Sequence, residues 1–123
     1  MIPETLHRPA LVVCALLAAV IAALSFVPVT ELPGPAQPQS TSTARLQHVL
    51  AYAALVFPAL ATRPAAALWV LPAAVGYGAV IELLQPLVGR ERAVADMIAN
   101  AIGAGIGALL GLMTHKLIVR GRG

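Results

Sequence analysis

Four long stretches of almost purely apolar sequence constrain this chain more than any other feature. They cover about residues 10–27, 44–61, 65–85 and 94–118. A helix needs about 20 predominantly apolar residues to cross a bilayer, and these stretches lack the period-two alternation of transmembrane β-strands. We therefore predict an all-α polytopic membrane protein with four transmembrane helices in one antiparallel bundle, forming a single domain over residues 1–123.

The composition agrees with a membrane environment. Hydrophobic residues make up 59% of the chain and charged residues 11%, whereas a soluble protein has about 25% charged residues. The basic residues lie near the ends of the apolar stretches rather than on one clustered face, which argues against a nucleic-acid partner. The single Cys14 can form no internal disulfide and has no metal-ligand spacing. We predict neither a metal site nor a cofactor.

The first apolar stretch has a second interpretation, as a signal peptide. Arg8 would supply its basic region, and Ala23-Leu24-Ser25 resembles a cleavage site. We favour a retained helix, because the stretch is longer than the usual apolar region of about 7 to 15 residues and retention gives an even number of spans. Residues 28–43 hold most of the Pro and Gly loop signals and are predicted to be a linker outside the hydrocarbon.

In each of the three later helices, polar residues share one face near one end, and in the last two that face also carries glycines. At about 100° per residue, the members of each group fall within a wedge of about 60° to 80°. The groups are Arg45, His48 and Tyr52; Gly78, Glu82 and Gln85; and Asp96, Asn100, Gly103, Gly107 and Gly111. The three glycines form a small-residue ladder, which favours close packing within the chain over the alternative of a homo-oligomer.

Antiparallel order would bring the three polar groups to the same side of the membrane. We predict a ligand site formed by Arg45, His48, Tyr52, Glu82, Gln85, Arg90, Asp96 and Asn100. Ionisable groups in spans usually pair with one another or face a wet cavity. Arginines at the rim suit an anionic headgroup carrying phosphate, pyrophosphate or carboxylate.

The basic residues also predict an orientation. With both termini in the cytoplasm, five of the eight lie inside (Arg8, Arg63, Lys116, Arg120 and Arg122) and three outside (Arg45, Arg90 and Arg92). This is a modest positive-inside bias. It predicts that the polar cluster lies on the outer side.

The ordered motifs resemble the VanZ-like family of bacterial membrane proteins. They are Arg45-x-x-His48-x-x-x-Tyr52, Glu82-x-x-Gln85, Gly89-Arg90 and Asp96-x-x-x-Asn100-x-x-Gly103. Two positions depart from the family pattern, which commonly has Asp-Lys where Ala44-Arg45 stands and a small hydroxyl residue near Ala93. The resemblance implies the plasma membrane of a bacterium, a role in the cell envelope and a link to low-level resistance to the glycopeptide teicoplanin. It implies no particular reaction.

Three functions remain open on the sequence. The favoured one is binding of a membrane lipid or lipid-linked envelope precursor through its headgroup. The second is a small intramembrane hydrolase or headgroup transferase, with His48 as general base oriented by Glu82 or Asp96. No nucleophile elbow or phosphate-binding glycine loop supports an enzyme. The third is a purely structural cluster that fastens the helices together.

Overall fold

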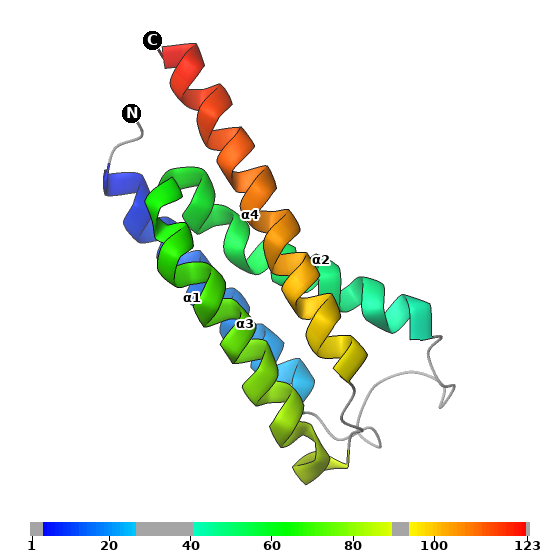
Figure 1. Cartoon of the computed structure of the whole chain (residues 1–123). Helices are drawn as coiled ribbons and strands as arrows, with labels where there is room; N and C mark the ends of the chain where they lie inside the picture. The colour runs from blue at the N-terminus through cyan, green and yellow to red at the C-terminus, as the bar shows by residue number, and fades with distance from the viewer. Residues whose placement is uncertain (1–3, 27–40, 90–93, 123) are drawn as a thin grey trace.

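The computed structural model describes residues 4–26, 41–89 and 94–122, and this part of the chain is helical almost throughout (Figure 1). The elements in order are α1 (Glu4–Ser25), α2 (Thr41–Thr62), the short 3-10 helix η2 (Pro64–Ala66), α3 (Ala67–Leu84), the 3-10 helix η3 (Gln85–Val88) and α4 (Val94–Arg122). Four helices are long and apolar enough to cross a membrane. The prediction of an all-α chain with four membrane-length helices is confirmed.

Some helix ends differ from the predicted ones. α1 begins at Glu4 rather than at residue 10 and contains Pro9. The His7 side chain is buried and bonds to Thr62 on α2, so a contact between helices holds this first part of α1 in place. α4 continues to Arg122 rather than ending at residue 118. Basic side chains near a helix C-terminus are favourable because they interact with the helix dipole.

The predicted linker is shorter at its C-terminal end. Residues 41–43 belong to α2, which begins at Thr41 and ends at Thr62. Residues 28–40 of the linker lie outside the described part of the chain.

Some prolines lie inside helices, and two, Pro64 and Pro86, lie just after helix ends. Pro58 and Pro72 lie inside α2 and α3 without ending them, as neighbouring helices can allow in a membrane protein. Pro86 lies in η3, directly after α3 ends at Leu84. The cap of η3 is Gly89, whose φ of +78° is a left-handed conformation that favours glycine.

α2 and α4 pack most extensively, and glycines allow their close approach. A Cβ atom on Gly103 would lie 2.3 Å from the backbone oxygen of Val49, and one on Gly107 would lie 2.3 Å from that of Ala53. The small-residue ladder therefore packs against α2 within the chain. A homo-oligomer through these glycines stays a prediction, and it would require α2 to leave the face that it covers.

The outer faces of the helices are apolar. Leu16, Leu50, Leu68, Leu87 and Leu109 are exposed members of a larger set of exposed hydrophobic side chains that occurs on every one of the four long helices. Soluble monomers rarely expose extended apolar surface. The surface therefore agrees with a multi-pass membrane protein, while the buried core lies around α2.

Candidate functional site

A pocket of about 170 Å³ lies where α1, α2, α3 and α4 meet, and we call it the polar pocket. Five of the eight predicted ligand residues line it: His48, Tyr52, Glu82, Gln85 and Asn100. The end of α1 adds three further lining residues, Ile21, Leu24 and Ser25. The polar faces predicted for the later three helices thus converge in one place.

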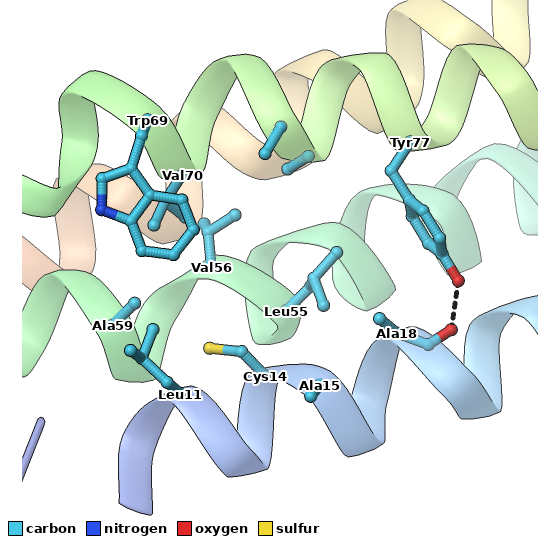
Figure 2. A pocket seen from close by; sticks show the side chains of 12 residues that line it. Leu11, Cys14, Ala15, Ala18, Leu55, Val56, Ala59, Trp69, Val70 and Tyr77 are labelled. Carbon is cyan, nitrogen blue, oxygen red and sulfur yellow. Dashed lines mark hydrogen bonds between the residues drawn. The ribbon is translucent and has the colours of Figure 1, made fainter. Parts of the chain in front are cut away.

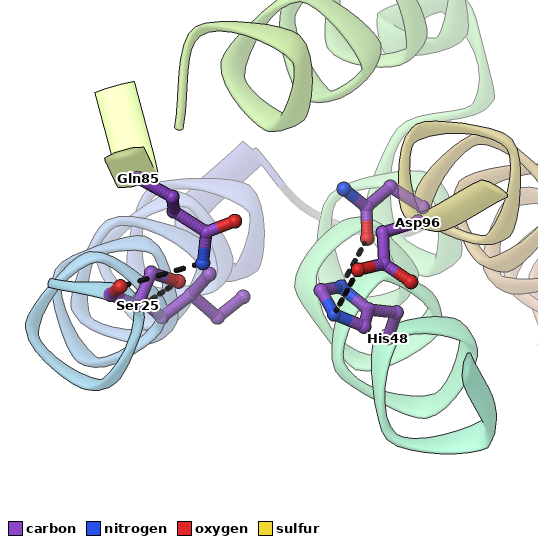
Figure 3. Close-up of polar contacts among 6 residues, drawn as sticks. Ser25, His48, Gln85 and Asp96 are labelled. Carbon is purple, nitrogen blue, oxygen red and sulfur yellow. Dashed lines mark hydrogen bonds and ion pairs between the residues drawn. The ribbon is translucent and has the colours of Figure 1, made fainter. Parts of the chain in front are cut away.

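His48 joins α2 to α4 at the edge of the polar pocket (Figure 3). Its Nδ1 atom lies 2.8 Å from Oδ1 of Asn100. Its Nε2 atom lies 3.7 Å from Oδ2 of Asp96, where an ion pair forms when the imidazole is protonated. Asp96 is in the first turn of α4, where a carboxylate is favoured by the helix dipole. Both ring nitrogens of His48 therefore face α4.

Glu82 and Gln85 occupy the α3 side of the pocket. Glu82 is buried with 1% of its surface exposed. Two orientations of the neighbouring Gln85 amide fit its position. In one, Nε2 donates to the Ser25 carbonyl at 3.3 Å (Figure 3); in the other, it donates to the Glu82 carboxyl oxygens at 2.8 and 3.2 Å. The Gln85 amide nitrogen makes only one of these two sets of bonds at a time, and the second orientation, with the shorter distances, joins Gln85 to Glu82.

Gly78 gives Tyr52 and Asn100 room to meet α3. A Cβ atom on Gly78 would lie 2.9 Å from Nδ2 of Asn100 and 3.1 Å from the Tyr52 hydroxyl oxygen. Both of these side chains are buried. The face shared by Gly78, Glu82 and Gln85 thus points into the bundle. Because Gly78 has no side chain, α2, α3 and α4 can approach one another closely there.

The other three predicted residues are placed differently. Asp96 contacts His48 but is not part of the pocket lining. Arg45 is exposed on α2, one turn before His48, and does not line the pocket. Arg90 lies outside the described residues. The described lining of the polar pocket therefore contains no Lys or Arg, and a positive rim is not part of it.

The metal-binding potential of the chain is limited in the described ranges. Across residues 4–26, 41–89 and 94–122, no group of three or more His, Cys, Asp or Glu side chains could hold a metal ion.

A second polar cluster, which no sequence motif predicts, lies at the other end of α2. Nδ1 of His7 lies 2.9 Å from Oγ1 of Thr62, which itself donates to the Pro58 carbonyl. Nδ1 of His115 lies 3.0 Å from the Ala61 carbonyl oxygen. These contacts satisfy polar groups in the last turn of α2. His7 and His115 are each the single histidine of their helix, so the sequence contains no motif that would predict this cluster.

The described fold and pocket define a class: an all-α chain with four membrane-length helices around a polar pocket. No protein-family model, no curated protein and no solved structure matches this chain. The resemblance to the VanZ-like family therefore rests on the ordered sequence motifs.

Proposed function

We propose that this chain is a VanZ-like protein of a bacterial plasma membrane and binds the headgroup of an envelope lipid or lipid-linked precursor in the polar pocket. The observation that carries this proposal is the pocket itself. Hydrogen-bonding side chains from α2, α3 and α4 line about 170 Å³ of space inside helices with apolar outer faces. Polar groups in spans usually pair or face a wet cavity, so a polar occupant fits this position.

The proposal includes an antiparallel bundle that crosses the membrane. Two close approaches support it. Nδ1 of His7 near the start of α1 lies 2.9 Å from Oγ1 of Thr62 at the end of α2, and the Gln85 amide after α3 lies 3.3 Å from the Ser25 carbonyl oxygen at the end of α1. The positive-inside bias supports an orientation with both termini in the cytoplasm. The polar pocket then lies toward the outer leaflet.

The chemistry of the pocket favours a headgroup with both donors and acceptors. The Glu82 carboxyl group accepts from hydroxyl or amino groups, while the amides of Gln85 and Asn100 both donate and accept. Arg45 is about 4.5 Å along the helix axis from His48, at 1.5 Å per residue. A phosphate held outside the pocket lining would bind Arg45, with Arg90 as the further partner that the sequence predicts, and the uncharged part of the headgroup would enter the pocket.

Native mass spectrometry of gently extracted protein tests this function. We expect wild type and Gly76→Ala to retain one selected anionic lipid, because a Cβ atom on Gly76 meets nothing within 4 Å. Glu82→Gln and Arg45→Ala should lose that lipid while keeping thermal stability close to wild type. A lack of any selected lipid, together with unfolding of Glu82→Gln, would show that the polar cluster only fastens the helices.

The alternative of a hydrolase or transferase gains no support from His48. A general base needs a ring nitrogen that reaches the substrate proton, whereas both nitrogens of His48 face Asn100 and Asp96. We therefore assign His48 to helix fastening. Product formation from a phospholipid by wild type, abolished in a folded His48→Ala variant, would overturn this assignment.

The link to teicoplanin resistance is part of the proposal at the level of phenotype. Binding of an envelope lipid would change which precursors are accessible at the outer surface. Expression of the wild-type chain in a susceptible bacterium should raise the inhibitory concentration of teicoplanin, and Glu82→Gln should not. Equal resistance from both proteins would separate the phenotype from the polar pocket.

A further inference from the structure

A second cavity of about 330 Å³ lies among α1, α2 and α3, and we call it the apolar cavity (Figure 2). Its walls include Leu11 and Cys14 on α1, Leu55 and Ala59 on α2, and Trp69 on α3. Figure 2 shows Trp69 and Tyr77 at opposite ends of the α3 wall. The cavity is therefore elongated along the helices.

The apolar cavity and the polar pocket follow each other along the same helices. On α1 the cavity is lined by residues between 11 and 18 and the pocket by residues between 21 and 25. On α3 and the start of η3 the two ranges are 69–77 and 81–85. The Tyr77 hydroxyl donates to the Ala18 carbonyl at the boundary (Figure 2). From Cys14 to Ser25 the axial distance is roughly 16 Å at 1.5 Å per residue.

The apolar lining of the cavity favours hydrocarbon over water. A buried water molecule needs two to four polar partners. The lining offers the Cys14 thiol, the Trp69 indole N–H and the Tyr77 hydroxyl, and the last already donates to Ala18. Since one water occupies about 30 Å³ of liquid, the cavity has room for roughly ten groups of that size. A stretch of alkyl chain has both the size and the polarity to fill it.

The order of the two spaces matches the order of groups in a lipid. The polar pocket lies at the ends of α1 and α3 and near the starts of α2 and α4, whereas Cys14 lies near the middle of α1. A lipid in a leaflet likewise places its headgroup near the membrane surface and its chain toward the centre. We propose that the apolar cavity holds one hydrocarbon chain of the same lipid whose headgroup occupies the polar pocket. The position of the headgroup rests on the proposed function, whereas the site for the hydrocarbon chain is inferred from the apolar cavity itself.

The only cysteine of the chain provides the test, because Cys14 lines the apolar cavity. The labelling rate of Cys14 by N-ethylmaleimide is measured in detergent with three probes. Palmitoyl lysophosphatidic acid carries a phosphate and one chain, monopalmitoylglycerol carries the chain without phosphate, and glycerol phosphate carries no chain. At a chain-bearing probe concentration of about ten times its Kd, we expect labelling to slow about tenfold, because only the unoccupied fraction reacts.

Two substitutions locate the protection. Ala73 and Ala15 line the cavity from opposite walls, whereas Ala54 is exposed on α2 and lines neither space. Ala73→Leu should abolish protection by the chain-bearing probes, and Ala54→Leu should leave it intact. If Ala73→Leu fails to fold, Ala15→Leu replaces it. If the maleimide does not reach Cys14, counting bound monopalmitoylglycerol by native mass spectrometry compares the same variants.

The possible failures are distinguishable. Unchanged labelling with both chain-bearing probes, or equal protection in Ala73→Leu and Ala54→Leu, would overturn the chain site even where Glu82→Gln loses a native lipid. Equal protection by lysophosphatidic acid and monopalmitoylglycerol, unaffected by Glu82→Gln, would confirm the chain site and overturn its link to the headgroup. Stronger protection by lysophosphatidic acid that needs Glu82 would support both.

Discussion

The Nδ1 atom of His48 lies 2.8 Å from the Oδ1 atom of Asn100, and this contact joins α2 to α4 beside the polar pocket. An amide oxygen only accepts, so the imidazole donates. Asn100 also places its Nδ2 atom next to Gly78 on α3. One amide side chain thus lies at the meeting point of three helices.

We expect His48 and Asn100 to be energetically coupled. The double-mutant cycle of His48→Ala and Asn100→Ala should give a coupling energy of about 0.6 kcal/mol, up to about 1.7 kcal/mol, as measured for interhelical hydrogen bonds in a membrane protein. Thermal or denaturant unfolding in detergent measures it. Leu46→Ala serves as control, because Leu46 is exposed on the same helix; its effect should add to that of Asn100→Ala. Full additivity of the His48 and Asn100 substitutions would contradict a direct bond.

The spacing between α2 and α4 depends on Gly107. A Cβ atom there would lie 2.3 Å from the Ala53 backbone oxygen and 2.7 Å from a Val56 methyl carbon. We expect Gly107→Ala to lower the free energy of unfolding by about 1–3 kcal/mol or more, the usual cost of overpacking.

Gly105 is the matched control for this prediction. It lies on the same helix, and an added Cβ atom meets nothing within 4 Å. Gly105→Ala should be neutral or stabilise the protein by up to about 1 kcal/mol, since alanine favours a helix more than glycine does. Equal melting temperatures for the two variants would disprove the close approach of α2 and α4.

We expect the polar pocket to depend on the absence of a side chain at Gly78. In Gly78→Ala the new methyl group would meet the Asn100 amide and the Tyr52 hydroxyl. These are side-chain atoms that can shift, so we expect a smaller effect on stability than in Gly107→Ala and about a tenfold loss of lipid affinity, or roughly 1.4 kcal/mol. Lipid titration followed by native mass spectrometry measures this, with Gly76→Ala as control. Lipid binding equal to wild type would place the headgroup elsewhere.

Much of the architecture and part of the site could be predicted because the signals are local. Apolar length predicts the four helices, and helical spacing places Gly78, Glu82 and Gln85 on one face, which the structure buries. Short connections then predict which helix ends meet. Those steps need no knowledge of how far each helix is rotated about its own axis.

The remaining contacts depend on how each helix is rotated about its own axis and how far it is shifted along its neighbours. Arg45 shares a face with His48 in the sequence, yet it is exposed one turn nearer the start of α2 and does not line the pocket. The contact of His48 with Asp96 and Asn100 follows from the close approach of α4 at its glycines. Ser25 joins the site only through the packing of α1. None of these contacts is encoded by spacing within one helix.

The hydroxyl of Tyr77 helps to hold α1 in place. It donates to the Ala18 carbonyl and so connects α3 to α1 beside the apolar cavity (Figure 2). Tyr77→Phe keeps the ring and removes this bond. We expect a loss of about 0.6 kcal/mol in stability, the average for such bonds in a membrane protein, and faster labelling of Cys14 because α1 is held less firmly.

Tyr52→Phe is the control for this prediction, because it removes the other tyrosine hydroxyl at the polar pocket and leaves the Tyr77 contact in place. Labelling of Cys14 by N-ethylmaleimide without added lipid should accelerate in Tyr77→Phe and remain at the wild-type rate in Tyr52→Phe. Acceleration in both variants would mean that the whole bundle has loosened. An unchanged rate in Tyr77→Phe would show that packing against α2, rather than the bond to α3, holds α1 at the cavity.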